Sequence, residues 1–282
     1  MVDTTVLHTG IRFGDGPRQG PDGRLYYSDF YDHEVRAFDL STGVEEVVCT
    51  VPGQPSGLGW LPDGRLLVVS MRDRRVLRLE PGGLVEHADL GGVATFHAND
   101  MLVDAAGRAY VGNFGFDLHG VIAARGEAAL LAPDYRPPTA ALALVSPTGA
   151  VSVVCEDLAF PNGMGFLGDT LVVAETLAFG LTAFDVAADG SLSGRRVWAD
   201  LRGHGVAPDG IAVHEDGVWV APALQAAAFL VVDGRVARRV ETSQPCFAVA
   251  VVRDTLVCCT APTSQPEVVS VDRLGKLEAY GL

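Results

Sequence analysis

Short runs of apolar and β-branched residues, separated by turns that contain Gly, Asp or Pro, recur along the whole chain. In the first stretch such runs cover residues 24–29, 35–40 and 44–49, and each is about six residues long. Aromatic and β-branched residues in runs of this length favour strands over helices. The pattern therefore predicts a protein built of short strands joined by turns.

The same order of strands and turns repeats along the chain. The repeats begin near residues 11, 58, 100, 164, 211 and 247, most of them about 40 to 48 residues apart, with four short strands in each. This organisation is typical of the blades of a β-propeller. The predicted fold class is all-β, a six-bladed β-propeller that forms a single domain over residues 1–282. The N-terminal segment is expected to complete the last blade beside the C-terminal strand and so to close the ring.

One interval between repeats is longer than the others. Residues from about 114 to 144 are rich in Ala and end in a stretch that contains Pro and Asp. A loop or short-helix insertion is predicted there, either as a lid or binding loop or as a solvent-facing segment without a function. His33, His119 and His204 fall in predicted loops and are expected at the surface.

One position of the repeat, called the slot here, is polar in almost every unit. It is filled, in chain order, by Asp15, Ser56, Asn99, Asn162, Asp209 and Cys246. If the repeats close into a ring, these side chains meet on its axis. Carboxylate and amide oxygens, which suit Ca²⁺, Mg²⁺ or Mn²⁺, are supplied by Asp15, Asn99, Asn162 and Asp209. The slot predicts a central metal site, and the alternative is that Asp and Asn beside Gly are ordinary turn residues.

Composition and charge narrow the range of partners. The chain has 282 residues, 48% of them hydrophobic, and a formal net charge of -14. The acidity argues against nucleic acid, and no apolar run approaches the roughly 20 residues of a membrane span. The first residues show no secretory signal, and the five cysteines include no CxxC pair. We expect a cytoplasmic monomer with free thiols that acts on a small molecule.

Several short motifs together carry a resemblance to a known family. They are Gly-Asp-Gly-Pro at 14–17, Asn-Asp at 99–100, Phe-Pro-Asn-Gly-Met at 160–164, Ala-Glu-Thr at 174–176 and Pro-Asp-Gly-Ile at 208–211. Through them the chain resembles the family of senescence marker protein, gluconolactonases and luciferin-regenerating enzymes, from about residue 14 to residue 271. The resemblance implies a six-bladed propeller with one divalent cation in its central channel.

The resemblance also implies roles for individual residues. Asp15, Asn162 and Asp209 fall on the metal-ligand positions, and Asp209 also falls on the position of the general base. Asn99 falls near the metal, where it can contact substrate. Two departures stand out, because Asp15 replaces the Glu that is usual in the family, and His97 stands where sugar lactonases commonly carry Arg. His97 is a candidate substrate-binding residue, and the substrate need not be a sugar-acid lactone.

The predicted activity is that of a metal-dependent lactone hydrolase, gluconolactonase-like. The cation, Ca²⁺ in the first place with Mg²⁺, Mn²⁺ or Zn²⁺ as alternatives, would polarise the carbonyl while Asp209 activates a water molecule. A related metal-dependent esterase or phosphotriesterase on the same site stays open, as does a non-catalytic ligand-binding propeller. The chain has no GxSxG motif, which argues against serine hydrolase chemistry.

Overall fold

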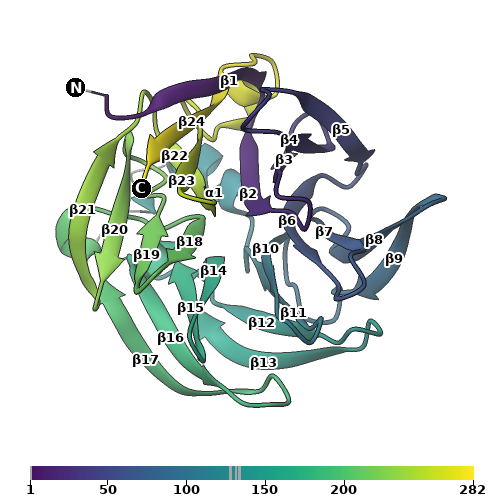
Figure 1. Cartoon of the computed structure of the whole chain (residues 1–282). Coiled ribbons are helices and arrows are strands. Elements are labelled where there is room, and N and C mark those ends of the chain that lie inside the picture. Colours follow the sequence, from purple (N-terminus) through teal and green to yellow (C-terminus); the bar gives the residue numbers. More distant parts are fainter. Residues whose placement is uncertain (1, 127–128, 131, 133–134) are drawn as a thin grey trace.

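The fold is a ring of six four-stranded antiparallel sheets around a central axis, as Figure 1 shows. The computed structural model describes residues 2–126, 129–130, 132 and 135–282. The prediction of an all-β six-bladed β-propeller is therefore confirmed.

The blades follow one another in chain order. Blade 1 contains β2 (Gly14–Gln19), β3 (Leu25–Asp29), β4 (Glu34–Phe38) and β5 (Glu45–Thr50). Blade 2 contains β6 (Pro55–Trp60), β7 (Leu66–Ser70), β8 (Arg75–Glu80) and β9 (Gly83–Asp89). Blade 3 contains β10 (Ala98–Val103), β11 (Ala109–Asn113), β12 (Ala140–Val145) and β13 (Val151–Leu158).

The remaining three blades have the same organisation. Blade 4 contains β14 (Pro161–Leu167), β15 (Thr170–Glu175), β16 (Gly180–Val186) and β17 (Leu192–Asp200). Blade 5 contains β18 (Ile211–His214), β19 (Gly217–Val220), β20 (Ala227–Val232) and β21 (Arg235–Glu241). Blade 6 contains β22 (Cys246–Val252), β23 (Thr255–Thr260), β24 (Gly275–Gly281) and β1 (Thr5–Ile11).

The ring closes in blade 6, where the two ends of the chain share one sheet. Strand β1 pairs antiparallel with β24, so that Thr5 lies opposite Ala279 and Ile11 lies opposite Gly275. The buried carboxylate of Glu278 on β24 accepts hydrogen bonds from Thr4, Ser243 and Thr260. The predicted pairing of the N-terminal segment with the C-terminal strand is confirmed.

The first strand of each blade lies nearest the axis (Figure 1), and these inner strands approach one another very closely. A Cβ atom added at Gly57 would lie 2.1 Å from the backbone nitrogen of Met101 on the next blade. One added at Gly163 would lie 2.4 Å from the nitrogen of Ile211. Glycine is required at these positions because no larger residue leaves room for the neighbouring backbone.

Between the blades the core is apolar and densely filled. One cluster packs Leu67, Val69 and Met101 between blades 2 and 3, and another packs Val172, Ile211 and Val218 between blades 4 and 5. The alternation of faces along each strand places these side chains against the next blade. The apolar residues of the strands therefore pack adjacent blades against one another around the axis.

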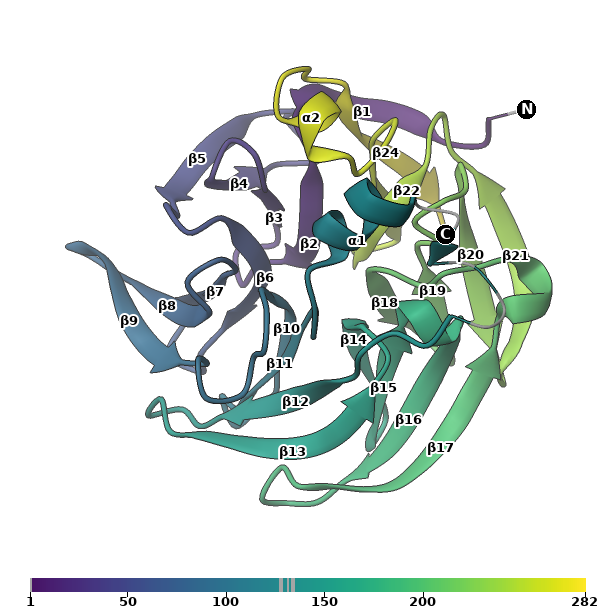
Figure 2. The same ribbon diagram turned by 180° about the vertical axis from the view of Figure 1, so that it is seen from behind.

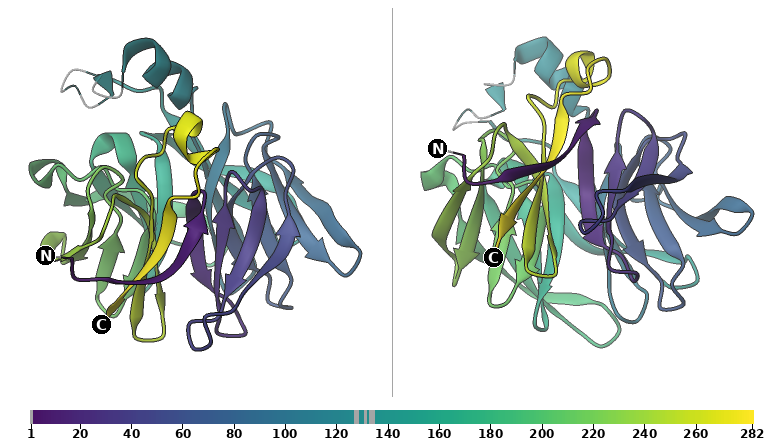
Figure 3. Two further views of the ribbon diagram at one scale, coloured as in Figure 1. Left: turned by 90° about the horizontal axis from the view of Figure 1, so that it is seen from above. Right: turned by 45° about the horizontal axis from the view of Figure 1, so that its top comes forward.

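Two short helices stand above one face of the ring, as Figures 2 and 3 show. Helix α1 (Leu118–Arg125) lies between β11 and β12, and Asp117 caps its first turn by accepting a hydrogen bond from the Gly120 nitrogen. Helix α2 (Pro266–Val269) lies between β23 and β24. Residues 127–128, 131 and 133–134, part of the predicted insertion at about 114–144, lie outside the described residues.

Two one-turn 3-10 helices complete the fold, η2 (Thr176–Ala178) and η3 (Arg202–His204). None of the helices in the described ranges has the length and hydrophobicity that a membrane crossing requires. The described structure is thus dominated by the six sheets, with the helices confined to connections.

Candidate functional site

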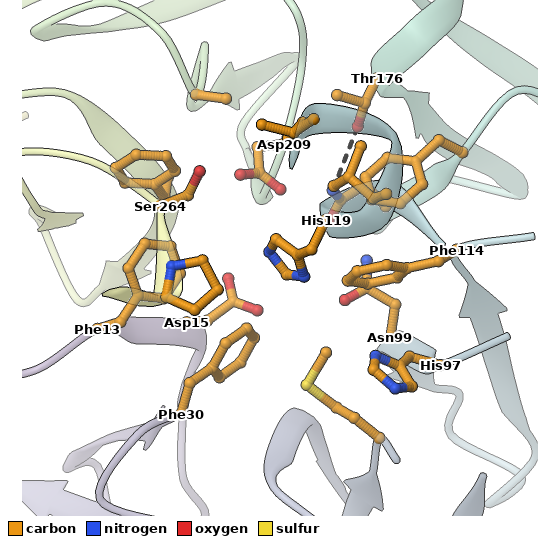
Figure 4. A pocket seen from close by; sticks show the side chains of 18 of the residues that line it. Phe13, Asp15, Phe30, His97, Asn99, Phe114, His119, Thr176, Asp209 and Ser264 are labelled. Atoms are coloured by element: carbon orange, nitrogen blue, oxygen red, sulfur yellow. Dashed lines mark hydrogen bonds between the residues drawn. The ribbon is translucent and has the colours of Figure 1, made fainter. Parts of the chain in front are cut away.

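A cavity of about 180 Å³ opens at the end of the central channel beneath α1 (Figure 4). All six blades contribute side chains to its lining, and α1 adds Leu118, His119 and Ile122. Helix α1 lies over one end of the propeller axis (Figure 2), and its side chains close part of the lining. The cavity is therefore a composite of residues that lie far apart in the sequence.

Four of the six slot residues line this cavity, namely Asp15, Asn99, Asn162 and Asp209. The first three are buried, and Asp209 is partly buried. Figure 4 shows the carboxylates of Asp15 and Asp209 and the amide of Asn99 directed towards a common centre. The structure thus brings together the oxygen-bearing side chains that the repeat predicted, while their roles as ligands and catalytic groups stay predictions.

Local irregularities in the inner strands explain why these side chains point at the axis. Between Ala98 and Met101 of β10 two residues oppose one residue of β11, and a similar register shift separates Pro161 from Met164 in β14. Such a bulge leaves a residue out of the ladder and re-aims its side chain. Asp209, just ahead of β18, is held instead by a hydrogen bond from its nitrogen to the Ala221 oxygen (2.8 Å).

Ser56 supports the floor of the cavity from below. Its Oγ lies 3.5 Å from Oδ2 of Asp15 and 3.3 Å from Oδ1 of Asn99, and the residue is fully buried. Ser56 therefore links the slot residues of blades 1 and 3 without itself lining the cavity.

Cys246 departs from the sequence prediction that all six slot side chains meet on the axis. Its thiol packs with Trp219 and Cys258 in an apolar cluster between blades 5 and 6. A register shift between Cys246 and Ala248 leaves Phe247 as the extra residue, and Phe247 lines the cavity instead. The prediction was wrong for blade 6 because the bulge there turns the following side chain towards the axis.

Asp100 is a buried carboxylate that the sequence analysis assigned no role. It directly follows Asn99, and its Oδ1 atom has no hydrogen-bond partner among the described residues. Burial raises the pKa of Asp100, whereas the nearby Arg18 guanidinium opposes this shift. The Asn-Asp pair in the sequence was the available signal for a third carboxylate beside the slot.

The carboxylates at the centre repel one another. Burial, followed by the negative charge of Asp100, raises the pKa of Asp15 to about 8. Burial and the charges of Asp15 and Asp100 raise the pKa of Asp209 well above its ordinary value. Fully ionised, the three carboxylates and the Arg18 guanidinium would sum to a charge of -2, namely -3 and +1.

This donor set fits a hard divalent cation. The carboxylates of Asp15 and Asp209 and the amide oxygen of Asn162 are all oxygen donors, and a divalent charge would offset the net -2 of the ionised cluster. Within the described part of the chain, no group of three or more His, Cys, Asp or Glu side chains is arranged to hold a metal ion. A candidate cation site here would therefore depend on amide oxygens as much as on carboxylates.

A second set of side chains lines the cavity above the slot residues that form its floor. It consists of the residues two positions before each slot residue in blades 1 to 5, all of which line the cavity, namely Phe13, Gln54, His97, Phe160 and Ala207. Alternate residues of an extended chain share a face, which places them over the floor. His97 is half-buried, with its ring centroid 4.2 Å from that of Phe96, and burial and then Arg72 lower its pKa.

His119 is a second residue whose position differs from the prediction. It was expected at the surface, whereas Figure 4 shows its ring pointing from α1 into the cavity. Burial lowers the pKa of His119, which favours the neutral imidazole. The sequence analysis missed it because nothing in the repeat indicates how an insertion folds back over the channel.

Comparisons with known proteins agree with the fold and the motifs. Residues 13–261 match the family described as the SMP-30/gluconolactonase/LRE-like region. A comparison with curated proteins found no match. Solved structures similar to this one include a calcium-binding protein, regucalcin, from Agrobacterium tumefaciens, at 21% identity and a TM-score of 0.75, covering 98% of this chain and 94% of that one.

Two further solved structures share the architecture. A gluconolactonase from Xanthomonas campestris has 19% identity and a TM-score of 0.74, covering 99% of this chain and 89% of its own. A luciferin-regenerating enzyme has 17% identity and a TM-score of 0.80, covering 100% of this chain and 95% of its own. At these identities the likenesses establish the shared fold.

Proposed function

The chain belongs to the SMP-30/gluconolactonase/LRE-like family, and on that premise we propose that it is a metal-dependent hydrolase of lactones. The observation that carries the proposal is the convergence of Asp15, Asn99, Asn162 and Asp209, from four different blades, on one cavity. The structural relatives named as a gluconolactonase and as calcium-binding regucalcin support the reaction class and Ca²⁺ as the cation. Mg²⁺, Mn²⁺ and Zn²⁺ are the alternatives.

Asp15, Asn162 and Asp209 would hold the cation, which when bound supplies Lewis-acid polarisation of the substrate carbonyl. Asn99 is proposed to contact the substrate, together with His97 in the second set of side chains above it. Because Ser56 Oγ lies against Oδ1 of Asn99, the amide nitrogen is the group that Asn99 offers to an oxygen of the lactone.

Asp209 is the proposed general base. Its carboxylate accepts a proton from a water molecule, whose oxygen forms a bond to the carbonyl carbon of the lactone. The ring C–O bond then breaks, and the proton passes to the departing ring oxygen, so that the product is the open hydroxy acid. The buried surroundings make Asp209 a stronger base than an exposed aspartate, provided that it is held ionised.

The test of this role is the variant Asp209→Asn, which keeps the size of the side chain but removes the base. We expect turnover of lactones to fall by about 100-fold or more, with an unchanged circular dichroism spectrum. Asp216→Asn, on an exposed turn of the same blade, is the matched control and is expected to keep full activity. Full activity of Asp209→Asn would rule out the proposed base.

The two other functions considered for this fold make different predictions in the same assay. A metal-dependent esterase or phosphotriesterase would turn over open aryl esters or phosphotriesters in preference to lactones. A non-catalytic ligand-binding propeller would turn over none of them, and Asp209→Asn would then change only ligand or cation binding. We further propose that the protein is a monomer, since its ring is closed by β1 and β24, and that it acts on a small molecule in the cytoplasm.

A further inference from the structure

Above its oxygen-rich floor, the cavity has a wall of large apolar side chains. It consists of Phe13, Phe30, Met71, Phe114, Phe160 and Phe247, which we call the apolar wall. All six belong to a single hydrophobic cluster at the mouth of the channel. The upper part of the cavity therefore differs in chemistry from the floor.

The apolar wall arises from positions that recur in the repeat. Phe30, Met71 and Phe114 each directly follow the second strand of blades 1, 2 and 3. The corresponding positions in blades 4, 5 and 6 hold Thr176, Ala221 and Ala261, which are smaller. Four of the six wall residues thus belong to blades 1 to 3, while Phe160 and Phe247 extend the wall to blades 4 and 6.

The aromatic rings form two groups that face each other. The ring centroids of Phe13 and Phe247 are 4.8 Å apart and those of Phe13 and Phe30 are 5.4 Å apart. Across the cavity, Phe114 and Phe160 pack edge to face at 4.7 Å. Figure 4 shows Phe13 and Phe30 on one side of the cavity and Phe114 on the other. Two facing aromatic groups suit a flat ring between them.

The apolar wall is preformed. Each of its six side chains is buried and packed against its neighbours, so that little side-chain freedom is lost when a ligand binds. Leu118 and Ile122 of α1 continue the apolar surface over the mouth of the cavity. The cavity volume of about 180 Å³ compares with the roughly 150 Å³ of an apolar cavity that holds one benzene molecule.

Several polar groups around the wall are already engaged within the protein. The side-chain oxygen of Gln54 accepts a hydrogen bond from Nε of Arg72 at 2.9 Å. The hydroxyl of Thr176 donates to the Pro208 oxygen at 2.7 Å and accepts from Nδ2 of Asn162 at 3.2 Å. The imidazoles of His97 and His119 also line the cavity. A ligand with hydroxyl groups all around its ring would still turn some of them towards the aromatic side chains of the wall, which is unfavourable.

From these observations we propose that the lactone accepted by this site carries a flat aromatic or similar apolar group, seated in the apolar wall, in preference to a polyhydroxylated ring. The inference rests on the proposed lactonase function, because it places the carbonyl over Asp15 and Asp209 and the apolar group between the two sets of rings. The floor of the cavity would accept any lactone carbonyl, whereas the apolar wall selects the group attached to it.

Binding can be tested separately from catalysis with lactams, which have the shape of lactones but resist hydrolysis. We would compare dihydroquinolinone, the lactam counterpart of dihydrocoumarin, with gluconolactam and valerolactam by isothermal titration calorimetry. The aromatic lactam is expected to bind at least about tenfold more tightly than gluconolactam, since its ring removes apolar surface from water. Equal or tighter binding of gluconolactam would overturn the proposal.

A matched pair of variants on α1 tests the location of the aromatic group. Ile122 lines the cavity, whereas its neighbour Val121 does not, and neither belongs to the core of a blade. Ile122→Gln is expected to weaken binding of dihydroquinolinone several-fold without weakening that of gluconolactam. Val121→Gln is the control and should leave both unchanged. If Ile122→Gln weakened both lactams equally, the apolar surface at the mouth of the cavity would not distinguish the aromatic group, contrary to the proposal.

The two proposals can fail independently. Tight and selective binding of the aromatic lactam, combined with no hydrolysis of any lactone, would support the ligand class but contradict the lactonase. Hydrolysis of gluconolactone with a kcat/KM equal to or above that for dihydrocoumarin would support the lactonase but overturn the ligand class. Preference for dihydrocoumarin in both binding and hydrolysis is the result that we expect.

Discussion

At the scale of single residues, the centre of the molecule is defined by carboxylate and amide groups that line one cavity. Asp15, Asn99, Asn162 and Asp209 were identified from the repeat because one slot holds them in four units. Asp100 was missed, although it lies next to Asn99, because it occupies a different position of the repeat. Its proximity to the other carboxylates is a result of tertiary packing that no local pattern encodes.

Asp100 leads to a prediction about cation affinity. Asp100→Asn removes one negative charge from beside Asp15 and Asp209, so that the ionised cluster carries -1 in place of -2. We expect the affinity for Ca²⁺ to fall by about tenfold or more, because unit charges of opposite sign about 4 Å apart attract by roughly 1 kcal/mol even in water, and a divalent cation doubles this attraction. With chelator present, the variant is expected to melt at a higher temperature than the wild type, since a buried repulsion is gone.

Isothermal titration of Ca²⁺ and thermal unfolding with chelator measure the two effects. Asp216→Asn, on an exposed turn of blade 5, serves as the control and should change neither. An unchanged Ca²⁺ affinity in Asp100→Asn would mean that Asp100 is not part of the electrostatic environment of a cation.

At the scale of elements, the inner strands position the site through bulges and through glycine. The residue after the slot is Gly16, Gly57, Gly163 or Gly210 in four blades, and each packs against the backbone of the next inner strand. In blade 6 this position is Phe247, and there the slot residue Cys246 turns away from the axis. The sequence showed that this blade lacked the glycine, but only the strand register shows which side chain then faces the cavity.

The apolar wall also shows that the sequence repeat does not define which side chains face the cavity. Phe30, Met71 and Phe114 stand at one recurring position, so the repeat contained the signal for them. Apolar residues of the repeat were expected in the core, and only polar ones were candidates for the site. Their exposure to the cavity depends on where each strand ends relative to the channel, which is a property of the assembled ring.

The sheet of blade 6 yields a prediction about stability and pH. Burial would raise the pKa of Glu278, but hydrogen bonds from Thr4, Ser243 and Thr260 outweigh it and hold this pKa below its ordinary value. The stability that ionised Glu278 provides is therefore fully present above its unfolded-state pKa of about 4.3 and is lost as the pH falls through its folded-state pKa. Glu278→Gln is expected to destabilise the protein by about 1–3 kcal/mol at pH 7.

Urea denaturation of the variant and the wild type at pH 7 and near pH 4 measures this dependence. The difference in unfolding free energy should shrink at the lower pH, because near pH 4 Glu278 of the unfolded wild type binds more protons than Glu278 of the folded protein. Glu215→Gln, on an exposed turn, is the control and should have little effect at either pH. A difference that stays constant between the two conditions would contradict the role of the ionised carboxylate in the closure of the ring.

At the scale of the whole molecule, the propeller holds residues from distant parts of the chain around one axis and leaves its channel open at one face. The period and strand count predicted the ring, and the pairing of β1 with β24 closes it. The insertion was visible in the sequence as a long interval between repeats. Its position over the channel depends on contacts of α1 with the assembled blades, such as the packing of Leu118 against the hydrophobic cluster that contains the apolar wall. That arrangement follows from the assembled face of the ring.

The central claim is that this face is the active site of a metal-dependent lactonase, and the most direct measurement is lactone hydrolysis by metal-stripped protein. A panel that includes dihydrocoumarin, valerolactone and gluconolactone would be assayed with chelator and after separate addition of Ca²⁺, Mg²⁺, Mn²⁺ or Zn²⁺. We predict that activity is lost with chelator and restored by at least one of these cations, with Ca²⁺ the first expectation. Undiminished hydrolysis by the stripped protein, or no hydrolysis with any of the four cations, would contradict the claim.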